Sequence, residues 1–121
     1  MKRDMDLARK ILFEMEKRPP LKGTFQQVEV DGYSEEDINY HVMLLDEAGL
    51  IKAQNLTSHS GGRYIPLRLT WQGHEFLDAA RDDTRWNKTK DAMAKAGGFV
   101  FEVAKALLIE FMKQQLFPSK P

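Results

Sequence analysis

The stretch from Gly32 to Ala80 constrains the fold most, because a marked helix start, a marked helix stop and two extended segments follow one another in it. The helix start lies at Ser34, whose hydroxyl can accept a hydrogen bond from the backbone amide of Asp37. The acidic side chains of residues 35–37 lie against the positive end of the helix dipole. The sequence therefore predicts that a helix begins directly after Ser34.

The predicted helix has one apolar face and a defined end. Ile38, Val42 and Leu45 recur at the spacing of a helix face that packs on a core. Gly49 can adopt the left-handed conformation that closes a helix. An extended run follows from Leu50 to about Thr57, so we expect the helix to end at Gly49 and a strand to begin after it.

A second strand and a second helix are predicted beyond a turn. Residues 58–62 are all turn formers, and residues 64–71 alternate sharply. The alternation places on one face Ile65, Leu67, Leu69 and Trp71, and on the other Tyr64, Pro66, Arg68 and Thr70. Thr70 is suited to cap a helix from Trp71 to about Ala80, in which Gly73 would allow close approach to the sheet.

This order of helix, strand, turn, strand and helix resembles a known type of domain. The segment LLDEAGLI leads into the hairpin and LRLTWQGHEFL leads out of it, as in the winged-helix domains of bacterial regulators. The resemblance implies an α+β fold, winged helix-turn-helix-like and mainly helical, with a small antiparallel β-hairpin wing and extra C-terminal helices. Such domains serve as DNA readers, protein-binding modules or dimerisation units, so fold alone does not choose among these functions.

The N-terminal part departs from the DNA-binding form of that pattern. A first helix, capped by Asp4 or Asp6, is predicted to run to about Lys17 and to pack inward through Met5, Ala8, Ile11, Leu12 and Met15. Its basic edge is interleaved with acidic residues and suits an ordinary solvated face better than a phosphate-binding one. Residues 24–30 alternate like a short strand that could pair with the wing. We therefore expect the second helix of a winged helix to be missing or reduced.

The C-terminal part is predicted to be helical. Residues 85–96 form a helix with Trp86 and Met93 inward, and Gly97-Gly98 breaks it. From Phe99 to Phe117 the chain is apolar around more than half of a helical circumference, so this helix needs packing partners on more than one side. We expect a winged-helix-like domain over residues 1–96, a C-terminal helix over 97–117 that pairs two copies through Phe99 to Leu116, and a tail over 118–121.

Charge and composition limit the classes of partner. The chain has 18 Lys and Arg against 18 Asp and Glu, so no global positive field attracts nucleic acid or an anionic membrane. There is no cysteine, which leaves neither disulfides nor thiolate metal ligands. The first residues lead into a charged amphipathic segment in place of an apolar signal core, so we expect a cytoplasmic protein. Charged residues at positions 102, 105, 110 and 113 interrupt the apolar C-terminal helix, so we expect no membrane span.

No catalytic motif is apparent. The three histidines, His41, His59 and His74, show no metal-ligand spacing, and there is no nucleophile elbow, phosphate loop or dinucleotide fingerprint. Adjacent carboxylates such as Asp82 and Asp83 diverge by about 100° on a helix and do not converge on one substrate. We therefore expect no enzyme, no catalytic residues, no cofactor and no metal.

The first functional hypothesis is a regulatory protein that binds duplex DNA. Asn39 and Tyr40 would face outward from the central helix and suit base or phosphate contacts, and Lys52 and Arg63 in the wing would contact phosphates. The charges oppose this, because residues 29–47 contain seven acidic side chains and no Lys or Arg. A wing-first mode of DNA binding fits those charges better than a recognition helix does.

The second hypothesis is a protein-binding adaptor that does not bind DNA. In it, the acidic central helix meets a basic partner through Glu35, Glu36, Met43 and Glu47, with Asp46 on the same face. Charge favours this hypothesis, whereas analogy of fold favours transcriptional regulation.

Read from end to end, the chain is similar to one catalogued group of bacterial and phage-associated proteins. The resemblance rests on MKRDMDLARKIL, YSEEDINYHVMLLDEAGLI and LRLTWQGHEFLDAARDDTRWNKTK, and it covers nearly the full length. The group is domain-of-unknown-function family 2513. The resemblance implies a small cytosolic protein of prophage or mobile-element context with a winged-helix-like body, and it implies no particular activity.

Overall fold

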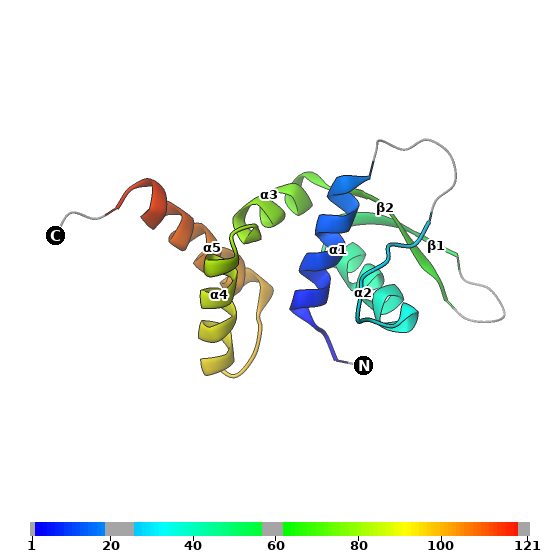
Figure 1. Cartoon of the computed structure of the whole chain (residues 1–121), viewed down its shortest axis with the longest axis horizontal. Coiled ribbons are helices and arrows are strands. Elements are labelled where there is room, and N and C mark those ends of the chain that lie inside the picture. Colours follow the sequence, from blue (N-terminus) through cyan, green and yellow to red (C-terminus); the bar gives the residue numbers. More distant parts are fainter. Residues whose placement is uncertain (1, 19–25, 57–61, 119–121) are drawn as a thin grey trace. The chain divides into compact units, whose positions relative to one another are not determined.

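A computed structural model of the chain describes residues 2–18, 26–56 and 62–118. Within them the fold is α+β and mostly helical (Figure 1). The elements are α1 (Met5–Lys17), α2 (Glu35–Glu47), β1 (Ile51–Asn55), β2 (Tyr64–Leu69), α3 (Trp71–Ala80), α4 (Asp83–Lys95) and α5 (Phe101–Leu116). The fold class expected from the sequence is confirmed at this level, whereas the winged-helix assignment stays a prediction.

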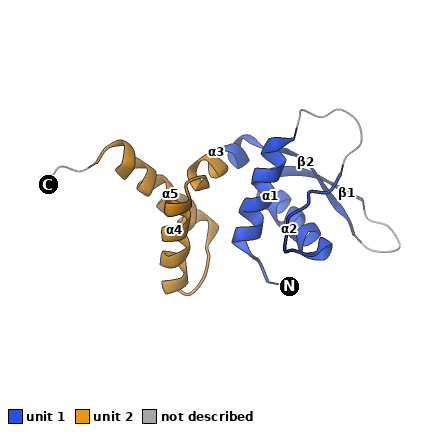
Figure 2. Cartoon of the chain, in the orientation of Figure 1, with its two compact units in different colours: residues 1–75 blue, residues 76–121 orange. Residues whose placement is uncertain are grey.

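The chain separates into two compact units, residues 1–75 and residues 76–121 (Figure 2). The first unit holds α1, α2, the hairpin and the start of α3, and the second holds the rest of α3 with α4 and α5. The division expected from the sequence, after residue 96, falls inside the second unit, where α4 and α5 pack on each other.

Helix α1 begins at the first of the two caps that the sequence offered. The Asp4 carboxylate accepts hydrogen bonds from the amides of Asp6 and Leu7, at 2.9 and 3.2 Å. Four of the five predicted inward residues are buried, and Leu7 is buried with them. The helix ends at Lys17, and Arg18 already has an extended backbone.

Helix α2 is built as the sequence predicts. The Ser34 hydroxyl accepts the amide of Asp37 at 3.1 Å. Ile38, Val42 and Leu45 are all buried. Gly49 has a φ of 77°, a conformation that L side chains rarely adopt, and it lets the chain turn directly from α2 into β1.

The two strands form an antiparallel hairpin with one irregularity. Ile51 lies opposite Leu69 and Lys52 opposite Arg68, but Ala53 lies opposite Pro66, so Leu67 is an extra residue in β2. Because of this bulge the simple alternation predicted for residues 64–71 is wrong in part, since Pro66 is buried. The turn formers 58–61 lie outside the described residues.

Residues 26–30 connect α1 to α2 without forming the expected strand. Val28 is buried, and the Gln27 side-chain amide donates to the carbonyl of Tyr64 at 2.9 Å. The segment is thus fixed to β2 by a side chain and not by a ladder of backbone hydrogen bonds. Residues 26–34 contain no helix, while residues 24 and 25 of the predicted strand lie outside the described part.

The start of α3 is fastened to the end of α2. The Thr70 hydroxyl donates to the carbonyl of Gly49 at 2.6 Å and accepts the amide of Gly73 at 3.0 Å, which confirms Thr70 as the cap. The predicted helix start at Trp71 is also confirmed. The alternation placed Trp71 on the same face as Ile65 and Leu69, and this was wrong, because those two residues are buried whereas Trp71 is 76% exposed.

The second unit has its own core. Asp82 caps α4 through the amide of Arg85, and Trp86 packs edge-on against Phe76, their ring centres 6.2 Å apart. Gly97 and Gly98 both have positive φ and end α4, as predicted. Helix α5 leaves several apolar side chains exposed, among them Val103, Ile109 and Leu116. The predicted pairing of two copies through residues 99–116 stays a prediction.

Candidate functional site

Helix α2 turns one side to the hairpin. The Asn39 side chain accepts the amide of Tyr64 at 2.7 Å and donates to the carbonyl of Gly62 at 3.3 Å. Two turns further on, the Asp46 carboxylate accepts the amide of Ala53 at 3.0 Å. Both side chains therefore fix hairpin backbone, and the amide of Asn39 that was expected to contact bases is already bonded on both its oxygen and its nitrogen.

The Asp46 contact lies at the bulge and explains how the bulge is tolerated. Ala53 and Pro66 face each other there, and Pro66 has no amide hydrogen to give to its partner. The amide of Ala53 goes to Asp46, and the carbonyl of Pro66 accepts Nη1 of Arg18 at 3.4 Å. The Ala53 amide and the Pro66 carbonyl at the bulge are thus each bonded by a side chain from outside the sheet.

The side of α2 opposite its buried residues presents a strip of four residues to solvent, Glu36, Tyr40, Met43 and Glu47, here named the outward strip. At 3.6 residues per turn they fall within about 60° of one another around the helix. Glu36 and Glu47 are exposed, and Tyr40 and Met43 are half-buried. Three of the four residues predicted for partner binding, Glu36, Met43 and Glu47, therefore belong to this strip. The fourth, Glu35, lies outside it, toward the hairpin side, and Tyr40 is the strip's fourth member.

His41 holds α2 against the start of α1. Its Nε2 accepts the amide of Asp4 at 2.7 Å, and its Nδ1 lies 2.7 Å from the carbonyl of Asp37. Since a backbone amide can only donate, Nε2 carries no hydrogen and Nδ1 carries it. The side chain is 1% exposed, so His41 has a structural place in the core, as the sequence suggested.

The four residues predicted for nucleic-acid binding are not brought together. Lys52 lies opposite Arg68 near the end of the hairpin that joins α2 and α3, whereas Arg63 precedes Tyr64 at the other end. Tyr40 lies on the outward strip, with its ring edge-on to that of His41. Asn39 faces the hairpin.

Arg63 instead borders an acidic hollow of about 940 Å³ between the 26–31 segment and α2. Four carboxylates line it, those of Glu29, Asp31, Glu35 and Glu36. Arg63 is the one Lys or Arg among the residues that line this hollow. The four carboxylates repel a phosphate, and Arg63 offsets that repulsion only in part. A DNA contact at Arg63 stays a prediction.

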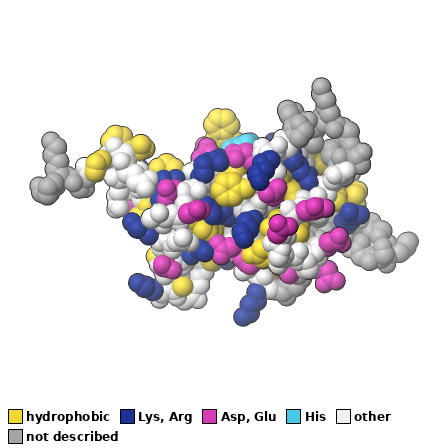
Figure 3. Space-filling model, in the orientation of Figure 1, with side chains coloured by type: hydrophobic (Ala, Val, Ile, Leu, Met, Phe, Trp, Pro, Cys, Tyr) yellow, Lys and Arg dark blue, Asp and Glu magenta, His cyan; other side chains and the backbone are white. Residues whose placement is uncertain are grey.

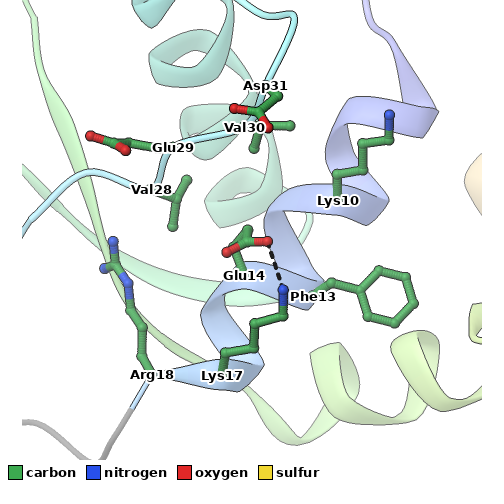
Figure 4. A pocket seen from close by; sticks show the side chains of 9 residues that line it. All are labelled: Lys10, Phe13, Glu14, Lys17, Arg18, Val28, Glu29, Val30 and Asp31. Carbon is green, nitrogen blue, oxygen red and sulfur yellow. Dashed lines mark hydrogen bonds and ion pairs between the residues drawn. The ribbon is translucent and has the colours of Figure 1, made fainter.

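A second hollow, between α1 and residues 28–31, carries charges of both signs (Figure 4). Lys17 and Glu14 form an ion pair at 3.0 Å along α1. Burial lowers the pKa of the Arg18 guanidinium, and the Glu14 carboxylate opposes that shift. With Glu29 and Asp31 opposite, this surface does not favour a ligand of either sign.

Sequence reasoning missed a third surface, at the end of the hairpin that joins α3. It is lined by Ala48, Gly49, Lys52, Arg68, Thr70, Trp71 and Gln72. It holds two cations and an exposed tryptophan, and no carboxylate lines it. Sequence reasoning could not find it, because Lys52 and Arg68 lie opposite each other only in the register that pairs Ile51 with Leu69.

Charge elsewhere on the molecule is mixed. On the face drawn in Figure 3, basic and acidic side chains lie interspersed.

Within residues 2–18, 26–56 and 62–118, no three His, Cys, Asp or Glu side chains are grouped so that they could hold a metal ion. None of the helices in that part of the chain has both the length and the apolar character that crossing a bilayer requires.

Comparison with known proteins assigns the family. The model of a family of hypothetical proteins, DUF2513, matches residues 2–99. The chain belongs to the DUF2513 family. An uncharacterised protein of Haemophilus influenzae is 42% identical to this DUF2513 chain over 90 residues, which cover 74% of the chain and 76% of that relative. No solved structure matches it. The family resemblance read from the sequence is thereby confirmed, and it brings no described activity with it.

Proposed function

We propose that this DUF2513 protein is a non-enzymatic binding protein whose outward strip on α2 docks onto a basic segment of a protein partner. The observation that carries the proposal is the composition of the strip, with two half-buried apolar or aromatic side chains between two exposed carboxylates. Tyr and Met are enriched at protein interfaces, and carboxylates at the rim select a partner of opposite charge.

The same strip is poorly suited to a DNA groove. In a winged helix that reads DNA, the helix before the hairpin enters the major groove, and affinity comes largely from neutralised phosphates. Helix α2 contains five acidic residues and no Lys or Arg over its whole length. Its one amide side chain, that of Asn39, is bonded to the hairpin.

The partner segment expected from this chemistry carries Lys or Arg on either side of a short apolar patch. Glu36 and Glu47 are separated by three helical turns, about 16 Å, so the two cations must stand about that far apart. A helix that places two basic residues about eleven positions apart with apolar residues between them meets this requirement. Such a segment would lie along α2 with its apolar residues over Tyr40 and Met43.

The test is capture of a partner from a bacterial lysate, followed by a quantitative binding measurement with the purified partner. Wild type should bind, and Glu36→Lys combined with Glu47→Lys should weaken binding at least about tenfold because like charges would then face each other. Tyr40→Ala with Met43→Ala should weaken it as well. The matched control, Glu102→Lys with Glu110→Lys, changes two exposed carboxylates of α5 by the same amount and should leave binding intact. A partner that is indifferent to both changes on α2 would refute the proposal.

A second candidate, regulation through duplex DNA, is favoured by the charge of the hairpin. Its described residues, 51–56 and 62–69, contain Lys52, Arg63 and Arg68 and no Asp or Glu. DNA would then be approached by the hairpin and not by α2. Lys52→Ala and Arg63→Ala should each weaken a salt-dependent mobility shift of duplex DNA, whereas Lys113→Ala in α5 should not. Absence of a shift at low salt would remove this candidate. A role in a phage or mobile element rests on the resemblance alone.

A further inference from the structure

Two cations lie directly opposite each other where the hairpin meets α3. Lys52 in β1 pairs with Arg68 in β2, and both side chains are exposed. Like charges directly opposite on one face of a sheet are destabilising. Within the described part of the chain no carboxylate pairs with either of them, and Arg68 donates Nη1 only to the carbonyl of Leu69, at 3.2 Å. The two charges therefore stand next to each other without a neutralising carboxylate, and an anionic ligand would relieve their repulsion.

Beside the pair stands an indole held out in solvent. Trp71 is 76% exposed, although it is a large and mostly apolar side chain. Its Nε1 donates to the carboxylate of Glu75, one turn along α3. Its N–H is therefore already bonded. What it offers to a ligand is the flat aromatic surface and not a hydrogen bond.

The cations and the indole share one shallow hollow of about 540 Å³. Thr70, which also lines it, is used internally as the cap of α3. Glu75 holds the edge of the indole and does not line the hollow. The hollow thus presents two positive charges and one aromatic face to an incoming molecule.

We propose that this hollow binds a single-stranded segment of nucleic acid, with backbone phosphates against Lys52 and Arg68 and one base stacked on Trp71. Grooves that bind single strands combine cations along the backbone with aromatic side chains under the bases. An acidic peptide would use the cations, but its carboxylates offer no flat ring to the indole, whereas every nucleotide carries a phosphate and a base together. In a duplex the faces of the bases are covered by neighbouring base pairs, so no base could stack on Trp71. The site differs from the outward strip on α2, and the two proposals stand or fall separately.

Tryptophan fluorescence tests the proposal directly. The chain has two tryptophans, and Trp86 is 1% exposed, so quenching by a ligand in solution reports on Trp71. The full chain is titrated at low salt with a thymidine oligonucleotide about twelve nucleotides long. Stacking should quench the emission in a saturable way. A duplex containing the same strand and a polyglutamate of similar charge should not quench it.

Variants separate the parts of the site. Trp71→Ala should weaken binding of the oligonucleotide roughly 5- to 150-fold, measured by fluorescence anisotropy of a labelled strand, and Trp71→Phe should recover part of the loss. Lys52→Ala and Arg68→Ala should each lower the salt dependence of log K by about 0.7. Lys113→Ala on α5 is the matched control and should match wild type. Circular dichroism verifies that every variant is folded.

Three results would overturn the proposal. The first is no quenching by the oligonucleotide at low salt. The second is equal binding of the duplex with no dependence on Trp71, which would support the duplex-DNA candidate instead. The third is tight binding of polyglutamate that Lys52→Ala and Arg68→Ala abolish, which would make the hollow a site for acidic protein segments.

Discussion

The carbonyl oxygen of Leu50 stands where a side chain on Gly73 would have to go: a β-carbon there would lie 1.9 Å from it. The first turn of α3 thus presses directly on the residue that precedes β1. The hydroxyl of Thr70 donates to the carbonyl of Gly49, the residue before Leu50, and so ties the start of α3 to the same segment. The end of α2, the base of the hairpin and the start of α3 form one junction, and that junction places Trp71 beside the cations of the hairpin.

Replacing Gly73 by alanine should therefore destabilise the protein. A helix gains about 1 kcal/mol when Gly becomes Ala, but forcing a methyl group against backbone costs about 1–3 kcal/mol or more, and here the overlap is severe. We expect a net loss of at least about 1 kcal/mol in the free energy of unfolding, measured by urea denaturation. Gln72→Ala, at the exposed neighbouring position, is the control. If Gly73→Ala were as stable as Gln72→Ala, the close approach of α3 to Leu50 would be wrong.

The reason for Gly73 was readable from the sequence, but its partner was not. A glycine inside an apolar helix pattern points to a close approach, because nothing else offsets its poor propensity. That the partner is the carbonyl of Leu50 follows only from how α2 ends. Local signals of this kind, such as the cap at Ser34 and the stop at Gly49, were predicted correctly because each depends on residues within one turn.

Sequence reasoning failed where tertiary contacts overrode a local pattern. The alternation of residues 64–71 placed Pro66 on the outer face and Trp71 on the inner one, but the bulge at Leu67 leaves Pro66 buried, and Trp71 is exposed as the first residue of α3. The same limit hid the role of Asn39, which is 25 positions from its bonded partner Tyr64. The hollow formed by Lys52, Arg68 and Trp71 needed the register of the hairpin, and register is not fixed by period alone.

Replacing Asp46 by alanine should weaken the hairpin. Its carboxylate is the acceptor for the half-buried Ala53 amide at the bulge, and leaving such an amide unbonded costs up to about 3 kcal/mol. We expect a loss of that order in the free energy of unfolding, together with faster hydrogen exchange of the Ala53 amide seen by NMR. Glu47→Ala removes the neighbouring exposed carboxylate and should change neither quantity. Equal effects of the two changes would contradict the assignment of Asp46 as a structural acceptor.

Asn39 allows stability and binding to be separated. Asn39→Ala should lower the free energy of unfolding by about 1–2 kcal/mol, because the Tyr64 amide loses its acceptor. It should leave the affinity of the folded protein for the oligonucleotide unchanged within twofold, since the side chain faces the hairpin. Fluorescence anisotropy at a temperature where the variant is fully folded measures this. A large loss of affinity without a loss of stability would restore Asn39 as a nucleic-acid contact.

Replacing His41 should destabilise the protein far more than replacing His74. Both nitrogens of His41 are bonded to backbone, and the ring is buried, whereas His74 is exposed in the first turn of α3. We expect His41→Ala to cost about 2–4 kcal/mol, combining a cavity with an Asp4 amide left unbonded, and His74→Ala to cost less than about 0.5 kcal/mol. Thermal unfolding followed by circular dichroism compares the two. Similar melting temperatures would mean that the contact between α1 and α2 does not depend on His41.

Tyr33 gives the fold a predictable response to alkaline pH. Burial, and then the carboxylates of Asp4 and Asp6, raise the pKa of the Tyr33 hydroxyl above its ordinary value of 10.0. The folded chain therefore holds this proton more tightly than the unfolded chain does. The resulting stabilisation is complete below the unfolded-state pKa and is lost as the pH rises through the folded-state pKa.

Urea denaturation at a series of pH values should show the free energy of unfolding of wild type falling above about pH 10, and falling less steeply in Tyr33→Phe. The tyrosinate absorbance of wild type, compared with that of the chain unfolded in urea, locates the shift independently. Identical slopes for the two proteins would show that Tyr33 ionises as freely in the folded state as in the unfolded one, and that the start of α1 does not enclose it.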